Sequence, residues 1–162
     1  FSYSTDGGTL RVFSTGAVSK IEVFSGASVI LNPAWPTAGQ WNHFALVRKS
    51  GTLYIYINGV QSGSVSYTTD LSAGTLTLGG ETTTHPLFGY MSDFRIVKGT
   101  AVYTSNFTPS TTPLTSISGT SLLTCQSSTL VDNSVNSAVI TRTGSAIVST
   151  NSPFINITEY KR

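Results

Sequence analysis

Charged residues and cysteine are scarce in this chain, and both shortages narrow the classes of protein to which it can belong. Asp, Glu, Lys and Arg make up 10 % of the 162 residues, against about 25 % in an average globular protein. The nine Lys and Arg residues are scattered and leave a net charge of +2, so the basic stripe that nucleic-acid binding requires is missing. Cys125 is the one cysteine, which excludes a disulfide within the chain.

Apolar runs are short, and helical patterns are nearly absent. No apolar run approaches the ~20 residues of a membrane-spanning helix, so we expect no membrane span. The chain is rich instead in Thr, Val, Ile, Tyr and Phe, which fit the pleated, half-buried surface of a strand. Hydroxyl-rich, weakly charged surfaces are typical of extracellular and virion-surface β-proteins, and we expect this localisation. Because the chain starts at Phe1 rather than at a methionine, we expect a piece of a longer protein or a processed product.

Strand-like segments recur about every eight to twelve residues, which is typical of a β-sandwich or barrel. Asn58-Gly59 lies between two of them and favours a tight type I′ hairpin, because both residues accept positive φ angles. The segments expected as strands are residues 10–13, 20–24, 28–31, 41–49, 52–57, 60–65, 75–78, 88–97, 121–125, 138–143 and 146–148.

Three stretches resemble laminin-G-like, concanavalin A-like domains. WNHFALVRKSGTLYIYINGVQSGS (Trp41 to Ser64) resembles the central hairpin of those domains, with its Trp-x-His entry and its Tyr-x-Asn-Gly end. LTLGG (Leu76 to Gly80) and LFGYMSDFRIVKGTAVYTSNFTP (Leu87 to Pro109) are similar to the next two segments, and the second is especially close to versions in phage tail and marine-virus surface proteins. The resemblance implies an all-β fold, an antiparallel β-sandwich with jelly-roll connections.

The domain organisation expected from this resemblance has three parts. Residues 1–109 form the body of the sandwich, residues 110–120 form a Ser/Thr/Pro-rich crossing, and residues 121–162 supply C-terminal strands. The segment from Thr120 to Gly144 resembles the opening of a further domain of this kind in tandem viral proteins. We expect these strands to complete the sandwich or to join a neighbouring chain by strand addition. The core is expected from Trp41, Ala45, Val47, Leu53, Ile55, Ile57, Leu76, Leu78, Phe94 and Ile96.

The acidic residues argue against an enzyme. Sugar hydrolysis on related folds needs two carboxylates about 5 to 10 Å apart, and none of the seven acids share a strand face at i, i+2 spacing. The Glu-x-Asp-x-x-Glu pattern of the hydrolase branch is also missing. His43 is expected to pack within its strand and His85 to lie in a solvated loop, so neither suggests a nucleophile triad.

Two kinds of binding site stay open. Sugars stack on exposed aromatic rings, and the candidate platforms are Trp35, Tyr54, Tyr56, Tyr67 and Tyr90. For Tyr54 and Tyr56, which share one strand face, the alternative is packing under a second layer or a loop. The resemblance also leaves open a calcium ion as the one cofactor, because many such domains hold Ca²⁺ with oxygen ligands. Its candidate ligands are Asp70, Asp132 and Asn133. Asp93 matches a family acid in position, and a hydrogen bond to a neighbouring loop or an ion pair is expected for it.

Two functions are compatible with these observations. The first is a non-catalytic carbohydrate-binding or adhesion module of a virion or cell-surface appendage such as a phage tail fibre, with a glycan or host surface receptor as partner. The second is a structural virion decoration or fibre subunit that assembles through its edge strands with other subunits. In both cases a homo-oligomer is expected, and because the same sandwich serves both uses, the fold does not decide between them.

Overall fold

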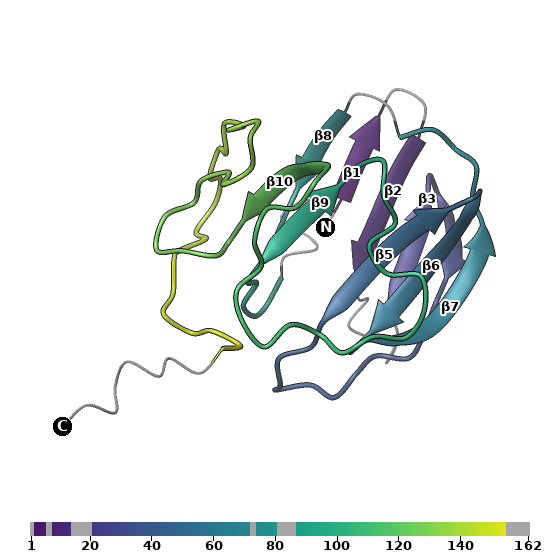
Figure 1. Cartoon of the computed structure of the whole chain (residues 1–162), viewed down its shortest axis with the longest axis horizontal. Helices are drawn as coiled ribbons and strands as arrows, with labels where there is room; N and C mark the ends of the chain where they lie inside the picture. Colours follow the sequence, from purple (N-terminus) through teal and green to yellow (C-terminus); the bar gives the residue numbers. More distant parts are fainter. Residues whose placement is uncertain (1, 6–7, 14–20, 72–73, 81–86, 155–162) are drawn as a thin grey trace. The chain divides into compact units, whose positions relative to one another are not determined.

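The computed structural model describes residues 2–5, 8–13, 21–71, 74–80 and 87–154; for residues 2–5, 8–9 and 13 it describes the backbone. The described part forms ten strands and no helix. The strands are β1 (Ser2–Thr5), β2 (Gly8–Phe13), β3 (Glu22–Ser25), β4 (Ser28–Leu31), β5 (Phe44–Lys49), β6 (Thr52–Ile57), β7 (Val60–Ser66), β8 (Gly74–Thr77), β9 (Phe94–Val97) and β10 (Thr120–Thr124) (Figure 1).

The chain divides into two compact units. Unit 1 comprises residues 1–88 and 101–109, and unit 2 comprises residues 89–100 and 110–162. Unit 1 contains a five-stranded antiparallel sheet in the order β4-β3-β2-β1-β8 and a three-stranded antiparallel sheet in the order β5-β6-β7. Unit 2 contains the antiparallel pair β9 and β10.

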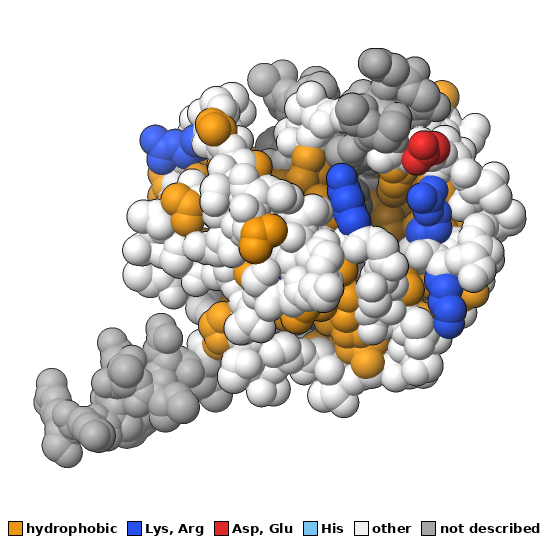
Figure 2. Space-filling view, turned by 45° about the horizontal axis from the view of Figure 1, so that its top comes forward, with side chains coloured by type: hydrophobic (Ala, Val, Ile, Leu, Met, Phe, Trp, Pro, Cys, Tyr) orange, Lys and Arg blue, Asp and Glu red, His pale blue; other side chains and the backbone are white. Residues whose placement is uncertain are grey.

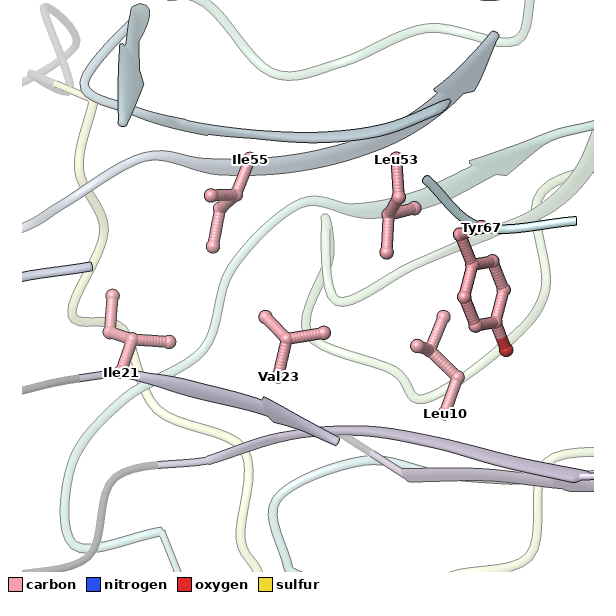
Figure 3. Packing of buried hydrophobic residues seen from close by; sticks show 6 residues of the cluster. All are labelled: Leu10, Ile21, Val23, Leu53, Ile55 and Tyr67. Carbon is pink, nitrogen blue, oxygen red and sulfur yellow. The ribbon is translucent and has the colours of Figure 1, made fainter. Parts of the chain in front are cut away.

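The two sheets of unit 1 enclose one apolar core. Leu53 and Ile55 point inward from the same face of β6, because side chains alternate along a strand. They face Leu10 and Val23 of the five-stranded sheet and Ile21, which directly precedes β3. Tyr67 closes one end of this core (Figure 3). This arrangement is an antiparallel β-sandwich, as the sequence predicted.

The predicted core is partly correct. Val47, Leu53 and Ile55 are buried and Ile57 packs against the central cluster, whereas Ala45, Leu76, Leu78, Phe94 and Ile96 are partly buried. Trp41 is wrong as a core residue, because its side chain is exposed. The physical reason is that β5 begins at Phe44, so Trp41 lies in the preceding loop and not on the strand's inner face.

Strand predictions near the C-terminus fail. Residues 138–143 and 146–148 form no strand in the described chain, and Val139 is 94 % exposed. The Ala138 amide at the start of this segment donates to the Asp132 carboxylate (2.9 Å), so it is not available to a neighbouring strand. Residues 88–93, expected as strand, are also irregular. β1 was not predicted, and His85 lies outside the described residues.

The β6–β7 turn matches its prediction. Asn58 and Gly59 have φ angles of +51° and +80°, as a type I′ turn requires. The segment at residues 106–107 holds this turn, since Phe107 N donates to Gly59 O (2.9 Å) and Gln61 N donates to Asn106 Oδ1 (2.9 Å). A Cβ on Gly59 would lie 1.9 Å from the carbonyl oxygen of Phe107, so the approach of these two backbones depends on glycine.

Charged side chains are few on the face of the molecule drawn in Figure 2. On the face drawn in Figure 2, Lys and Arg side chains stand in a few separate places among uncharged polar atoms. No helix among the described residues is long and apolar enough to cross a membrane.

We predict that Gly59→Ala lowers the free energy of unfolding by more than the ~1–2 kcal/mol that a left-handed backbone costs a residue with a side chain, because the new Cβ also collides with the Phe107 carbonyl. Gly26→Ala is the matched control, since Gly26 also has positive φ but has nothing within 4 Å of an added Cβ. Urea unfolding measures both variants. Equal losses for the two would show that the Gly59–Phe107 approach contributes no stability.

Candidate functional site

An exposed aromatic pair lies on unit 1 where the loop after β4 meets the start of β5. Trp35, from that loop, is 40 % exposed, and Phe44, the first residue of β5, is 43 % exposed. Their ring centroids are 6.4 Å apart and their planes are inclined by 41°. Two neighbouring rings that keep part of their faces in water form the kind of surface on which a sugar ring stacks.

Side-chain amides hold the loop that carries Trp35. Asn42 Nδ2 donates to the carbonyls of Thr37 (2.9 Å) and Gln40 (3.1 Å), and Asn42 Oδ1 accepts from Asn58 Nδ2 (2.9 Å). Asn58 Oδ1 in turn accepts from His43 N (2.8 Å). The hairpin turn therefore fixes both the loop and the residue before β5, which limits the motion of the aromatic pair.

An aromatic cluster covers the other face of the three-stranded sheet. Tyr103 and Phe107 stack at 3.6 Å, and His43 meets their edges at 6.0 and 5.4 Å. Phe107 also lies over Tyr56, with a centroid distance of 5.6 Å, and Tyr56 is 1 % exposed. Tyr56 is thus unable to offer a face to a sugar, and the alternative, packing under a loop, applies to it. His43 is a packing residue, as expected.

The other predicted platforms are distributed over both units. Tyr67 is 5 % exposed and lies with its hydroxyl beside Leu10 in the core (Figure 3), so burial removes it as well. Tyr54 is partly buried on β6, and Tyr90, in unit 2, is 60 % exposed. Trp35 and Tyr90 keep the exposure that a platform requires. The sequence analysis did not name Phe44 as a platform residue. The available signal was that Phe44 and Arg48 share one face of β5 and lie near its two ends, where that face extends beyond the core.

A polar pocket of about 440 Å³ lies at the β5–β6 turn of unit 1, lined by Arg48, Ser50, Gly51, Tyr67, Thr68 and Asp70. Tyr67 N donates to Gly51 O (2.7 Å), which ties the segment after β7 to the turn. Arg48 Nη1 donates to the Thr69 carbonyl. Asp70, a predicted metal ligand, is exposed and lines this pocket together with Arg48, whose positive charge disfavours a cation there.

The other predicted metal ligands have different partners. The Asp132 carboxylate accepts from Leu123 N (3.0 Å), Ser134 N (2.8 Å), Ser134 Oγ (2.8 Å) and Ala138 N (2.9 Å). Asn133 N donates to Leu123 O (2.7 Å), and Asn133 Nδ2 donates to Gln126 Oε1 (3.3 Å). Among the described residues no three His, Cys, Asp or Glu side chains are grouped for a metal. The calcium site stays a prediction, with Asp132 committed to the loop.

Environment changes the pKa of two groups in unit 2. Burial raises the pKa of the Asp132 carboxyl, but the hydrogen bonds from Ala138, Ser134 and Leu123 lower it by more than burial raises it. The pKa therefore lies below its ordinary value. Burial raises the pKa of the Cys125 thiol, the Thr124 side chain opposes the rise, and the Asp93 charge adds to it. Cys125 is therefore a protonated, weakly reactive thiol at neutral pH.

Asp93 has the loop-bridging role expected for it. Its Oδ1 accepts from Leu114 N (2.7 Å) and its Oδ2 from Ser92 Oγ (2.6 Å), while Asp93 N donates to Cys125 O (3.0 Å). These contacts join the residue before β9 to the long connection and to the end of β10. Its carboxylate thus serves the structure of unit 2.

Unit 1 is thus a two-sheet β-sandwich domain with an aromatic pair and a polar pocket on its surface. A family model of laminin G type, described as the concanavalin A-like lectin/glucanases superfamily, matches residues 1–105, and the chain belongs to this superfamily. The membership makes it a carbohydrate-binding type of module. No curated protein and no solved structure matches the chain significantly.

We predict that Asp132→Asn lowers the free energy of unfolding at pH 7 by about 1 kcal/mol or more, because an amide has one accepting oxygen and its Nδ2 cannot accept the protons that Ala138 N and Ser134 Oγ donate to Asp132 Oδ2. Hydrogen exchange at the Ala138 amide, which loses its acceptor, should accelerate. The stabilisation is complete above the unfolded-state pKa of about 4 and is lost as pH falls through the lower folded-state pKa, so the difference from the unsubstituted chain should vanish in acid.

Asp70→Asn is the matched control for this prediction. It removes the same charge from an exposed carboxylate and should leave both the unfolding free energy and the exchange rate of Ala138 unchanged. If both variants lose equal stability at pH 7, net charge and not the Asp132 hydrogen-bond set is the cause.

Proposed function

We propose that the chain is a non-catalytic carbohydrate-binding module for adhesion, carried on a virion or cell-surface appendage such as a phage tail fibre. The observation that carries the proposal is the exposed Trp35–Phe44 pair on a domain of a lectin and glucanase superfamily. The aromatic faces would bind the apolar face of a sugar ring, and the amide-braced loop keeps them in position before the ligand arrives. Preorganisation of this kind reduces the entropy lost on binding.

The surroundings of three acids in the described chain favour binding without turnover. A glycosidase needs one carboxylate as acid and a second as base or nucleophile across the scissile bond. The carboxylates of Asp93 and Asp132 both accept backbone amide protons and so hold loops in place. Asp70 has a guanidinium and hydroxyls around its pocket, which suits recognition of a polar ligand.

The appendage setting rests on sequence resemblance. Residues 87–109 are similar to segments of phage tail and marine-virus surface proteins, and low charge with abundant hydroxyl side chains suits a virion surface or an extracellular location. A glycan or host receptor would be the partner on one side, and other appendage subunits the partners on the other.

A second function, that of a structural subunit, is favoured by the exposed apolar side chains of the C-terminal segment. Val135, Val139 and Ile147 are all more than four-fifths exposed. Burying each of these side chains in a contact with another chain would contribute a small favourable free energy, and the contributions add. A neighbouring subunit would bury them. The two functions are compatible, because a fibre protein can assemble through one surface and bind glycans through another.

For the binding function we expect specific hits on a glycan array. Trp35→Ala or Phe44→Ala should lower the affinity at least tenfold, because the contact between the aromatic ring and the apolar face of the sugar disappears. Tyr90→Ala, which removes the other exposed platform candidate, in unit 2, tests the rival position and is expected to bind as the unsubstituted chain does. Loss with Tyr90→Ala alone would assign the platform to Tyr90 instead. An array without hits from a folded sample would contradict the proposal. EDTA in a parallel array tests the calcium prediction.

For the structural function we expect sedimentation velocity to show a homo-oligomer that dissociates when Val135, Val139 and Ile147 are all replaced by serine. Val60→Ser, which alters an exposed valine of unit 1, should leave the oligomer intact. A monomer at all accessible concentrations would exclude self-assembly through these side chains.

A further inference from the structure

The polar pocket at the β5–β6 turn has a ligand chemistry of its own, which the aromatic pair does not provide. Arg48 and Asp70 both line the pocket, together with the hydroxyl-bearing residues Ser50 and Thr68. Among the residues that the structure describes, Arg48 makes one hydrogen bond, to the Thr69 carbonyl, and Asp70 makes none. Cation and anion thus share one pocket without neutralising each other in an ion pair.

One backbone hydrogen bond and two side-chain contacts hold the pocket in shape. The Tyr67 N to Gly51 O hydrogen bond joins its two walls, and Thr68 Cγ2 lies 3.3 Å from where a Gly51 Cβ would be. The bond from Arg48 to the Thr69 carbonyl orients the guanidinium along the wall and leaves its remaining N–H donors for a ligand. Its volume of about 440 Å³ lies within the usual range for small-molecule sites.

We propose that this pocket binds one sugar residue of a neutral glycan through its hydroxyl groups. A divalent cation would be repelled by Arg48 and an inorganic anion by Asp70, whereas a neutral polyhydroxyl ligand satisfies both. Each sugar hydroxyl donates and accepts, so adjacent hydroxyls can donate to the Asp70 carboxylate while their oxygens accept from Arg48. Hydrogen bonds to charged groups are about twice as strong as neutral ones.

The pocket is a subsite separate from the aromatic pair. Phe44 and Arg48 lie four residues apart on β5, which corresponds to about 13 Å at ~3.3 Å per residue, so one monosaccharide cannot touch both. This inference deepens the proposed carbohydrate-binding function and rests on it. A monosaccharide probe therefore reports on each subsite independently.

The test is an NMR titration of the ¹⁵N-labelled chain with methyl α-glucopyranoside, methyl β-galactopyranoside and methyl α-mannopyranoside. Saturable shifts at the Gly51 and Thr68 amides are expected with at least one glycoside, and the Trp35 indole N–H reports the aromatic pair. Asp70→Asn and Arg48→Gln should each raise the Kd measured at Gly51 at least tenfold and leave shifts at the Trp35 indole unchanged. Lys49→Gln, which removes the adjacent cation on the opposite face of β5, should change neither.

The outcomes separate the two proposals. Shifts at Trp35 without shifts at Gly51 and Thr68 overturn the pocket assignment and leave the binding function standing. No shift at either place with any of the three glycosides overturns the pocket assignment, and the glycan array then decides the binding function. Tighter binding of calcium chloride or sodium phosphate than of any glycoside, measured at the same amides, overturns the assignment to a sugar.

Discussion

The packing of β6 against the five-stranded sheet is the interaction on which the rest of unit 1 depends. Leu53 and Ile55 are buried against Val23 and Leu10, and burying an aliphatic side chain of this size contributes about 1.5–3 kcal/mol. Because β6 is the central strand of its sheet, its position determines where β5 and β7 lie. Both candidate subsites are at the ends of β5, so their geometry follows from this core although neither belongs to it.

A second layer of contacts transmits that order to the surface. Asn58 of the β6–β7 turn bonds to Asn42 and to His43, and the loop with Trp35 is thereby tied to the hairpin. On the other face, Phe107 caps Tyr56 and its amide bonds to Gly59. A rigid scaffold with short polar braces to its loops is a common way to present binding residues with little flexibility.

Local features of this fold could be predicted from the sequence, and features that depend on distant partners could not. The Asn58-Gly59 turn follows from the φ preferences of two adjacent residues, and the inward face of β6 follows from simple alternation. Tyr56 has the same alternation as an outward-facing tyrosine, but its cover comes from Phe107, about fifty residues later, and no local pattern indicates it. Val139 and Ile147 have strand-like neighbours, yet the Asp132 carboxylate captures the Ala138 amide. The resemblance indicated the family, whereas the Arg48–Asp70 pocket arises from a turn and a loop meeting in space.

The loop around Asp132 also determines how β10 can grow. On the side of β10 that faces away from β9, Leu123 N donates to Asp132, Leu123 O accepts from Asn133 N, and Ser121 O accepts from Asn136 Nδ2 (2.9 Å). These are the backbone groups that a newly arriving strand would need. The residues that follow β10 therefore occupy the hydrogen-bonding groups of its outer edge, which opposes fibrillar assembly by strand addition at this edge. Any contact between copies that involves this region has to use side chains rather than a continued ladder.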